Sequence, residues 1–530
     1  MLGKRTRQLS IADVDGWRDR IARHSVWFRM HEWSDVHLSD EAFAGWYAQN
    51  GRPSIPPSYM VTLLLLQVRQ GWSDREAVEA AMFDDRVKFA LGTSRMPEIH
   101  CDHTTVVRYR ARLLESNLGR QLVGETLKQA ADAGLLSNDE DLVDSFPIAG
   151  FAARQSTHVL IYRAIGRVLS EASEAGLAVG PLKRSDYGQH RKPAIRWSDD
   201  SERQRLLEDL VADGRTLVAL FGQTQIEALG QAVKLLGLVV EQDIETVDGQ
   251  VRIAQKTAKD RIVSTEDPEM RHGRKTSSQR FNGFKGHVMT TNGGRDEAHL
   301  VTAVVVTAAN AGDGEMLPAL LAQRAALTGE MPAQVMGDTA YGSMEVRNRV
   351  AEAAPAVRVE APVPPASAAG GRYAKTDFAI DTQACTVRCP AGQTVTYRPK
   401  KAIDGHKRVQ TIAFPAALCG ACPLRAQCVG GKRGRTLSIG VDEARVATER
   451  ARQEAPQWQD HYRKRSRVEH VNARLTRHGA RHARGHGVAR VQLQVCLAAT
   501  VANIEEMARA LGRVWQAPGP FRPQCEQTAV

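Results

Sequence analysis

Residues 461–477 read His461-Tyr-Arg-Lys-Arg-Ser-Arg-Val-Glu-His-Val-Asn-Ala-Arg-Leu-Thr-Arg477. The spacing predicts one helix with an apolar stripe, formed by Val468, Val471 and Leu475. Glu469 is the only acid among many cations in this stretch. A lone carboxylate repels the phosphates that its basic neighbours attract, unless a divalent cation lies between them. The presence of Glu469 in this basic stretch therefore needs a physical explanation.

Two interpretations of Glu469 are open from the spacing alone. Tyr462 and Arg465 fall near the same side of the predicted helix as Glu469. Glu469 could make a surface ion pair with Arg465 at the i,i+4 spacing, which is common on helices. It could instead bind a metal ion together with acids from other parts of the chain. The rest of the sequence decides between them.

The size and charge of the chain point to several domains and an anionic partner. A chain of 530 residues can form roughly two to four domains with separate cores. The net charge is +11 and the pI is near 9.3, which is weak evidence for a polyanionic partner. The excess is local: residues 461–490 contain Glu469 as their only acid, whereas residues 198–213 are rich in acids.

Apolar runs are short. The stretch from Val61 to Val68 is far too short to cross a bilayer, and no apolar run follows the basic residues at the N-terminus. We therefore expect a cytoplasmic protein with no membrane partner. Eight cysteines are too few for a disulfide scaffold, yet five lie between Cys385 and Cys428.

The first 140 residues are expected to be helical. Apolar residues recur at helical spacing in 17–30 and again from Met60, and Ser73-Asp-Arg-Glu76 has the pattern of a capping box. A further helix from Thr104 or Thr105 to about Glu115 presents three basic side chains, Arg108, Arg110 and Arg112. This segment could be a helix-turn-helix module that binds DNA, or a plain helical bundle with a solvated arginine face.

The middle of the chain predicts a mixed α/β layer. Asp141–Ile148 reads as a buried strand with Asp144 near its end, and Gln334–Asp338 as a second strand that ends in an acid. Between them we expect a helical insertion at about 150–245, strands at 284–291 and 299–307 joined through Asn292-Gly-Gly294, and a helix at about 313–328. A last strand is expected at 357–363.

The predicted domains follow from these elements. We expect a helical DNA-binding domain at 1–140, the first part of an α/β core at 141–363, a cysteine-containing insertion at 364–445, C-terminal helices at 446–515 and a loose tail at 516–530. The apolar segment 491–511 should pack as a helix against the sheet.

Three carboxylates stand out in this arrangement: Asp144, Asp338 and Glu469. Such acids can hold two divalent ions about 4 Å apart, which together activate a nucleophile and stabilise a leaving oxygen in phosphoryl transfer. Mg²⁺, or Mn²⁺, suits a site made of a few carboxylates, water and phosphate oxygens.

The motifs around these acids resemble the DDE (Asp-Asp-Glu) transposases of bacterial insertion sequences. Tyr462-x2-Arg465-x3-Glu469 is similar to their Tyr-Arg-Glu signature, Leu142-Val-Asp144-Ser-x-Pro147-Ile to the first-acid segment and Gly337-Asp338-x-x-Tyr341 to the second. Further resemblance lies in Asp267-Pro-Glu-Met-Arg271, Phe281-Asn-Gly-Phe-Lys285 and Val306-Thr-x-Ala-Asn310-x-x-Asp313-Gly. The motifs are short singly and specific together.

This resemblance implies an RNase H-like core that nicks DNA at the terminal inverted repeats of the element and transfers the freed 3′-hydroxyl to target DNA. It further implies a homodimer in the synaptic complex and a nucleoid-associated protein. Tyr462, Arg465 and Lys285 would contact DNA. The family signature usually has a Lys seven residues beyond the Glu, where this chain has Thr476, so Arg477 would reach the phosphate in its place, although the two cations are not equivalent.

The cysteine segment has two interpretations. Four cysteines resemble those in the insertion of one subgroup of the family: Cys389, Cys419, Cys422 and Cys428. Four thiolates could close a structural zinc site, with Cys385 as a substitute for Cys389, or the segment could hold four reduced cysteines in a small β-rich insert.

The leading function is thus an active transposase. The alternatives are a catalytically inactive, domesticated DNA-binding protein and a nuclease that cuts without joining. The presence of all three acids favours catalysis.

Overall fold

The chain forms two compact units. The computed structural model describes residues 25–48, 50–93, 101–116, 118–189, 192–255, 258–275, 278–293, 298–366, 369–398 and 410–512. The first unit comprises Met1–Gly312, Ala319–Met331 and Val468–Val530, and the second comprises Asp313–Pro318 and Pro332–Arg467. The predicted tail and residues 17–24 of the first predicted helix lie outside the described ranges.

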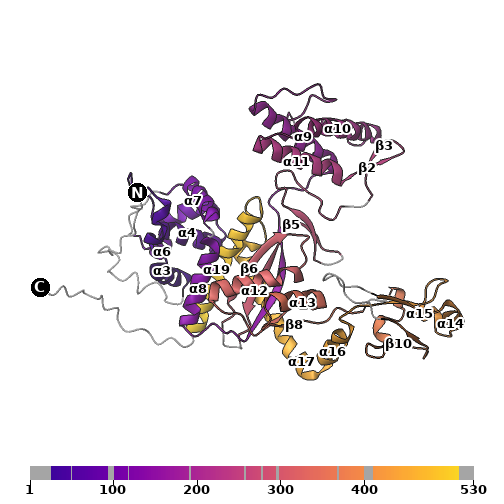
Figure 1. Cartoon of the computed structure of the whole chain (residues 1–530). Coiled ribbons are helices and arrows are strands. Elements are labelled where there is room, and N and C mark those ends of the chain that lie inside the picture. The colour runs from indigo at the N-terminus through magenta and orange to yellow at the C-terminus, as the bar shows by residue number, and fades with distance from the viewer. Residues whose placement is uncertain are drawn as a thin grey trace. The chain divides into compact units, whose positions relative to one another are not determined.

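Helices form the N-terminal part of the first unit, as predicted (Figure 1). They are α3 (Val26–His37), α4 (Pro57–Gln70), α5 (Asp74–Phe83), α6 (Asp85–Leu91), α7 (His103–Glu115) and α8 (Leu118–Asp132). Gly71 ends α4 in the left-handed conformation with φ 74°, which glycine adopts without strain. The capping box is confirmed, because the Ser73 hydroxyl accepts from the Glu76 N–H and the Glu76 carboxylate from the Ser73 N–H.

The sheet of the first unit is antiparallel. Its long strand β5 (Arg280–Thr291) pairs with β1 (Glu140–Ala149) on one edge, and with β6 (Val301–Ala308) and β4 (Arg271–Arg274) on the other. The predicted strand pair is confirmed. Asp144 lies in the middle of β1, opposite Val288, and not near the strand end. The prediction was wrong because β1 continues through Pro147, whose missing N–H the strand tolerates.

Helix α19 (Val488–Gly512) covers this sheet, as predicted, and also joins it to the N-terminal helices (Figure 1). The buried Asn503 amide accepts from the Val301 N–H at 2.7 Å and donates to the Val301 carbonyl at 3.0 Å. The same amide donates to the Thr126 hydroxyl of α8 at 2.9 Å. The N-terminal helices therefore pack in one unit with the sheet.

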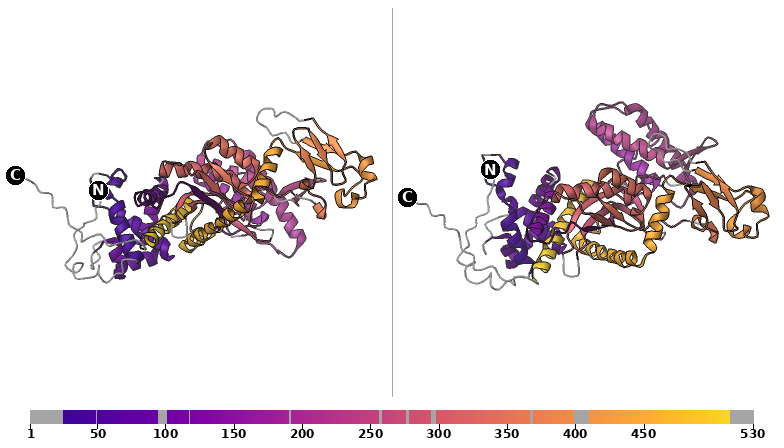
Figure 2. Two further views of the ribbon diagram at one scale, coloured as in Figure 1. Left: turned by 90° about the horizontal axis from the view of Figure 1, so that it is seen from below. Right: turned by 60° about the horizontal axis from the view of Figure 1, so that its bottom comes forward.

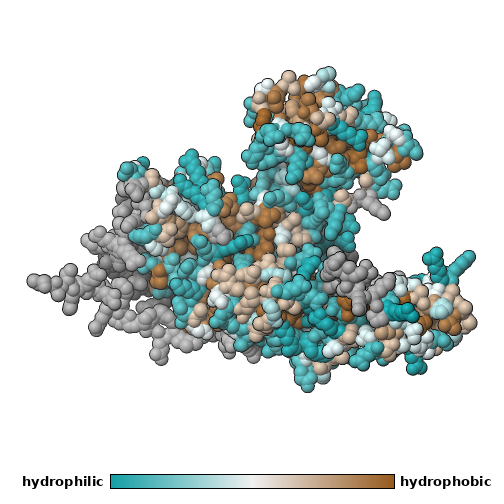
Figure 3. All heavy atoms as spheres, viewed as in Figure 1, coloured by the Kyte–Doolittle hydropathy of each residue, from teal (hydrophilic) through white to brown (hydrophobic). Residues whose placement is uncertain are grey.

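The predicted helical insertion is a three-helix bundle. Helices α9 (Thr157–Glu174), α10 (Asp200–Phe221) and α11 (Glu227–Gln242) lie side by side (Figure 2) and bury a common apolar core. A short hairpin follows, formed by β2 (Ile244–Val247) and β3 (Gln250–Ile253). Apolar surface shows on the bundle in Figure 3, and Leu220 and Leu238 are among its exposed side chains.

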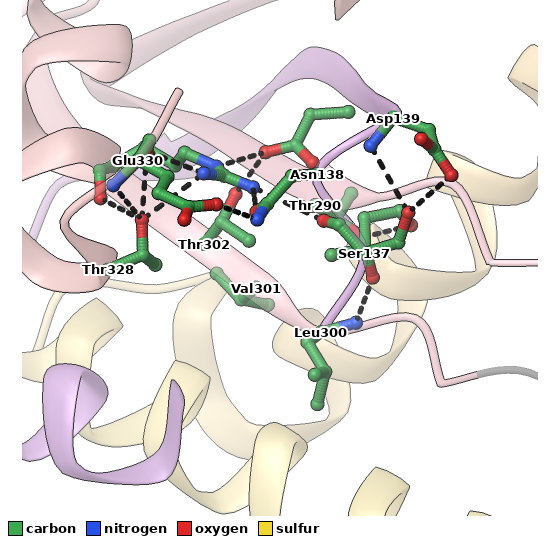
Figure 4. A network of polar contacts seen from close by, with 12 residues as sticks. Ser137, Asn138, Asp139, Thr290, Leu300, Val301, Thr302, Thr328 and Glu330 are labelled. Carbon is green, nitrogen blue, oxygen red and sulfur yellow. Dashed lines mark hydrogen bonds and ion pairs between the residues drawn. The ribbon is translucent and has the colours of Figure 1, made fainter. Parts of the chain in front are cut away.

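A buried ion pair fixes the start of β1. The Arg324 side chain on α12 (Leu317–Thr328) is 0% exposed, and its Nε lies 3.3 Å from the equally buried Asp141 carboxylate. Thr302 donates to the same carboxylate, while the guanidinium also donates to Asn138 and to the Glu330 carbonyl (Figure 4). Burial raises the pKa of Asp141, and the charge of Arg324 opposes this rise.

The second unit contains a parallel strand pair, β7 (Gln334–Met336) and β8 (Arg358–Glu360), connected by α13 (Met344–Ala353). The predicted last strand is thus shorter than 357–363. The cysteine segment forms the small strands β9 (Ala379–Asp381), β10 (Thr386–Arg388), β11 (Thr394–Thr396), β12 (Gln410–Ala413) and β13 (Thr436–Ile439) with the short helices α14 (Ala416–Gly420) and α15 (Arg425–Cys428). Helices α16 (Glu443–Glu454) and α17 (Pro456–Tyr462) follow.

The stretch 461–477 is not one α-helix, which corrects the sequence-based prediction. Helix α17 ends at Tyr462, a 3₁₀ turn covers Arg463–Ser466, and α18 runs over Arg467–Leu475 before a π-type turn. The Ser466 hydroxyl donates to the Arg463 carbonyl and so competes with regular helix bonding.

No described helix combines the length and apolar composition needed to cross a membrane.

We predict that Arg324→Ala lowers the free energy of unfolding by about 3–5 kcal/mol, because it leaves the Asp141 carboxylate buried without its cation. Arg163→Ala, which breaks the more exposed pair with Glu266, should cost less than about 1 kcal/mol. Urea denaturation measures both. Equal losses would contradict a structural role for the buried pair.

Candidate active site

The strand of the first predicted acid contacts the helix of the third. Asp144 is partly buried on β1, and its carboxylate accepts a hydrogen bond from the Asn472 side-chain amide of α18 at 2.9 Å. The two residues are 328 positions apart in the chain. The first unit thus brings β1 and α18 together at Asp144.

Helix α18 presents Glu469 beside this contact. Val468, Val471 and Leu475 are almost fully buried, so the predicted apolar stripe anchors the helix. Glu469 is exposed and lies three residues before Asn472, a spacing that makes the two side chains neighbours on one helix face. Asn472 therefore bonds to one of the predicted acids, Asp144, and is a neighbour of another, Glu469, on its own helix.

Asp338 belongs to the second unit, two residues after β7. Its carboxylate accepts from the Ala340 N–H at 2.9 Å and so begins a short 3₁₀ turn, Thr339–Tyr341. The guanidinium of Arg465 lies 4.0 Å from the Asp338 carboxylate, with side-chain exposures of 20% and 41%. The second acid and the arginine of the Tyr-Arg-Glu motif are thus neighbours. The place of Asp338 in one site with Asp144 and Glu469 stays a prediction.

Tyr462 is oriented by an aromatic stack. Its ring is nearly parallel to that of Trp458, with centroids 4.8 Å apart. The Trp458 N–H donates to the Glu360 carboxylate at 2.8 Å. Burial favours a higher pKa for Glu360, but hydrogen bonds from Arg452 and Trp458 outweigh it and hold the pKa below its ordinary value. The charged Glu360 carboxylate therefore holds Trp458, the residue on which the Tyr462 ring stacks.

The cations predicted to bind phosphate differ in their availability. Arg477 is exposed, and its side chain makes no ion pair or hydrogen bond within the described part of the chain. The Lys285 ammonium donates to the Ala311 carbonyl at 2.8 Å and is partly buried. Arg477 is therefore better placed than Lys285 to meet an external anion.

The arginines of α7 also differ. Arg110 pairs with Asp74 at 2.5 Å and donates to Gln67, which ties α7 to α4 and α5. Burial raises the pKa of Asp74, but the bonds from Arg110 and Gln67 prevail and leave that pKa lowered. Arg108 and Arg112 are exposed, and Arg112 lies over the Tyr47 ring. Arg108 and Arg112 remain the candidates for a ligand.

Four cysteines of the second unit line one cavity of ≈ 30 Å³, namely Cys389, Cys419, Cys422 and Cys428, whereas Cys385 is not among its lining residues. All four are free thiols, and the Arg435 backbone N–H points at the Cys419 sulfur at 3.5 Å. Burial raises the pKa of Cys428, while Arg435 opposes the rise. Whether these thiols bind zinc stays a prediction.

Sequence reasoning missed Asn472. The detectable signal was an amide at i+3 from Glu469, on the same helix face.

Within the described residues, no group of three or more His, Cys, Asp or Glu side chains is arranged so that it could hold a metal ion.

Comparisons with known proteins agree with these motifs. A family model described as "Transposase DDE domain" matches residues 388–508, which include Tyr462, Arg465 and Glu469. A model described as "Transposase domain (DUF772)" matches residues 16–112, which include the arginines of α7. No curated protein and no solved structure matches the chain.

We predict that Asn472→Ala weakens Mn²⁺ binding about 10-fold while preserving the fold, because the partner that orients Asp144 is lost. Asn348→Ala is the matched control, since Asn348 makes a similar amide–carboxylate bond to Asp442 in the second unit. Calorimetric titration with Mn²⁺ measures both. Unchanged affinity in the Asn472 variant would reduce the Asp144 contact to a packing role.

Proposed function

We propose that this chain is the transposase of a bacterial insertion sequence, which binds the terminal inverted repeats of its element and catalyses metal-dependent DNA cleavage and strand transfer. The two family matches support a DDE-type transposase. The α/β content supports an RNase H-like core, which the resemblance implies. DNA is accordingly the proposed partner, and two copies of the chain would form the synaptic complex.

One observation carries this proposal. The Asn472–Asp144 hydrogen bond joins the strand of the first acid to the helix of the third. Without such a contact the two motifs would be separate patterns in sequence. With it, Asp144 is bonded to a residue that follows Glu469 by three positions on the same helix.

The donor set fits a divalent cation. Carboxylate oxygens are the protein ligands that Mg²⁺ and Mn²⁺ prefer, and we assign Asp144, Asp338 and Glu469 to that role. The bound ions would supply an activated oxygen nucleophile and would neutralise charge on the leaving oxygen. Asn472 orients the Asp144 carboxylate, so that one of its oxygens keeps a fixed direction.

The remaining motif residues hold the DNA. We assign Arg465 to a phosphate next to the site, because a guanidinium stays charged at every relevant pH and can donate two parallel hydrogen bonds. The adjacent Asp338 carboxylate favours that orientation of Arg465. Tyr462, fixed by its stack on Trp458, and the exposed Arg477 extend the contact. None of these three residues transfers a proton in the proposed reaction.

In the proposed reaction, water attacks a phosphodiester at the element end, the bond to the 3′-oxygen breaks and a 3′-hydroxyl is released. That hydroxyl then attacks a phosphodiester of the target, which releases a second 3′-hydroxyl and joins the two DNAs. Both steps are in-line phosphoryl transfers and use the same acids.

We predict that Asp144→Asn, Asp338→Asn and Glu469→Gln each lower DNA nicking by at least about 100-fold while DNA binding persists, because each removes a charge that would hold the metal. Asp139→Asn, which changes an exposed acid just before β1, is the control and should retain activity. The assay follows nicking and joining of duplexes from the DNA that flanks the gene, with Mg²⁺.

The same assay separates the alternatives. Nicking without joining would identify a nuclease, and binding without nicking by the unmodified protein would identify an inactive derivative. Full activity of any acid variant would remove that acid from the site.

We also predict that the α7 surface binds the terminal repeats. Replacing Arg108 and Arg112 together by Ala should reduce the slope of log affinity against log salt by about 1.8, since each phosphate contact contributes about 0.9. Arg215→Ala on the helical bundle is the control. The full chain is used, because α4 and α8 pack against α19 and a fragment of 1–140 would lose that partner. An unchanged slope would assign repeat binding to another surface.

A further inference from the structure

The hairpin formed by β4 and the start of β5 extends beyond the sheet. Residues 271–285 contain five Arg and Lys residues and one His, but no acid. Within the hairpin, Arg274, Lys275 and Arg280 are exposed. We call these three residues the hairpin cations.

Gly283 marks the point at which the sheet becomes a ribbon of two strands. The register of β5 with β1 begins at Gly283, opposite Ala149, and the residues of β5 before Asn282, whose carbonyl accepts from the Gly150 N–H, pair only with β4. Gly283 has φ 149°, and a Cβ there would lie 2.3 Å from the Ile148 carbonyl oxygen. The crossing therefore requires glycine.

The charges on this ribbon oppose one another. Arg274 and Arg280 occupy directly opposite positions, an arrangement of like charges that destabilises a strand pair. In the described part of the chain, none of the hairpin cations makes an ion pair or a side-chain hydrogen bond. The second hairpin, β2–β3, has opposite charges at such a position, because Glu245 lies opposite Arg252. An external anion would relieve the repulsion between Arg274 and Arg280, and the described residues do not supply one.

The base of the ribbon is firmly held. The Asp267 carboxylate accepts from the Gly487 N–H at 3.1 Å, and Glu269 accepts from the Val488 N–H at the start of α19. The Arg271 guanidinium donates to the Pro268 and Met270 carbonyls, and burial lowers its pKa. The motif Asp267-Pro-Glu-Met-Arg271 thus fixes the ribbon, and the cations farther along remain exposed.

We propose that the hairpin cations bind backbone phosphates of duplex DNA beside the cleavage site, an inference that rests on the proposed function. A two-stranded ribbon fits a groove of B-form DNA. Arg280 lies eight residues before Val288, the partner of Asp144, on the same strand. At about 3.3 Å per residue this separation is about 26 Å, or about 8 base pairs of duplex. The contacted phosphates therefore lie within about 8 base pairs of the nick.

The test uses the full chain and duplexes from the DNA that flanks the gene. In the variant R274A/R280A the salt slope of binding should fall by about 1.8, because two phosphate contacts are lost. Ethylation of the phosphates within about 8 base pairs of the nick should interfere with binding by the unmodified protein and should no longer interfere with binding by this variant. Arg252→Ala on the other hairpin is the matched control and should change neither result. Nicking at saturating protein should persist, because these residues hold no metal.

A second variant separates binding from folding. Arg280→Glu would face Arg274 as Glu245 faces Arg252, so it should maintain or raise the melting temperature while weakening DNA binding more than Arg280→Ala does. An unchanged salt slope in R274A/R280A, or unchanged binding by Arg280→Glu, overturns the proposal. If the unmodified protein binds but does not nick, the proposed function fails, and the salt slopes still decide whether the hairpin binds DNA.

Discussion

The hydrogen bond from Asn472 to Asp144 is the constraint on which the candidate site depends. Its two residues are separated by 328 positions, so the fold must close a very long loop to make it. The contact is between β1, which pairs along its whole length with β5 except at Glu140, and a helix anchored by buried valines and a leucine. Both partners therefore lie on regular, packed elements, which hold a site for metal ions and phosphoryl transfer more accurately than loops do.

The C-terminal helix α19 supports this contact from behind. It lies against β6 and α8, and Asn503 satisfies both backbone groups of Val301 while it binds Thr126. The Arg474–Glu506 pair then ties α18 to α19. The buried Arg324–Asp141 pair fixes the beginning of β1, three residues before Asp144. Helices from both ends of the chain and the sheet between them thus hold one strand and one helix in place.

The sequence was informative where local rules dominate. The capping box at Ser73, the strand at Asp141–Ile148 and the apolar helix before Gly512 all follow from short-range patterns, and the structure has them. The break between α17 and α18 was missed, because it depends on a Ser466 hydroxyl competing for one carbonyl. Asn472 was missed since its role depends on a partner far away in the chain. The pairing of Arg110 with Asp74 was missed for the same reason. Arg108, Arg110 and Arg112 alternate in the sequence, which does not show that Arg110 is paired within the fold whereas Arg108 and Arg112 are exposed.

The most direct test of the central claim is a crystal structure of the full chain with Mn²⁺, located by its anomalous scattering. We predict a peak about 2 Å from carboxylate oxygens of both Asp144 and Glu469, with Asn472 still bonded to Asp144. A well-ordered structure in which Mn²⁺ binds elsewhere, or in which the two carboxylates are too far apart to share an ion or a pair of bridged ions, would contradict the account.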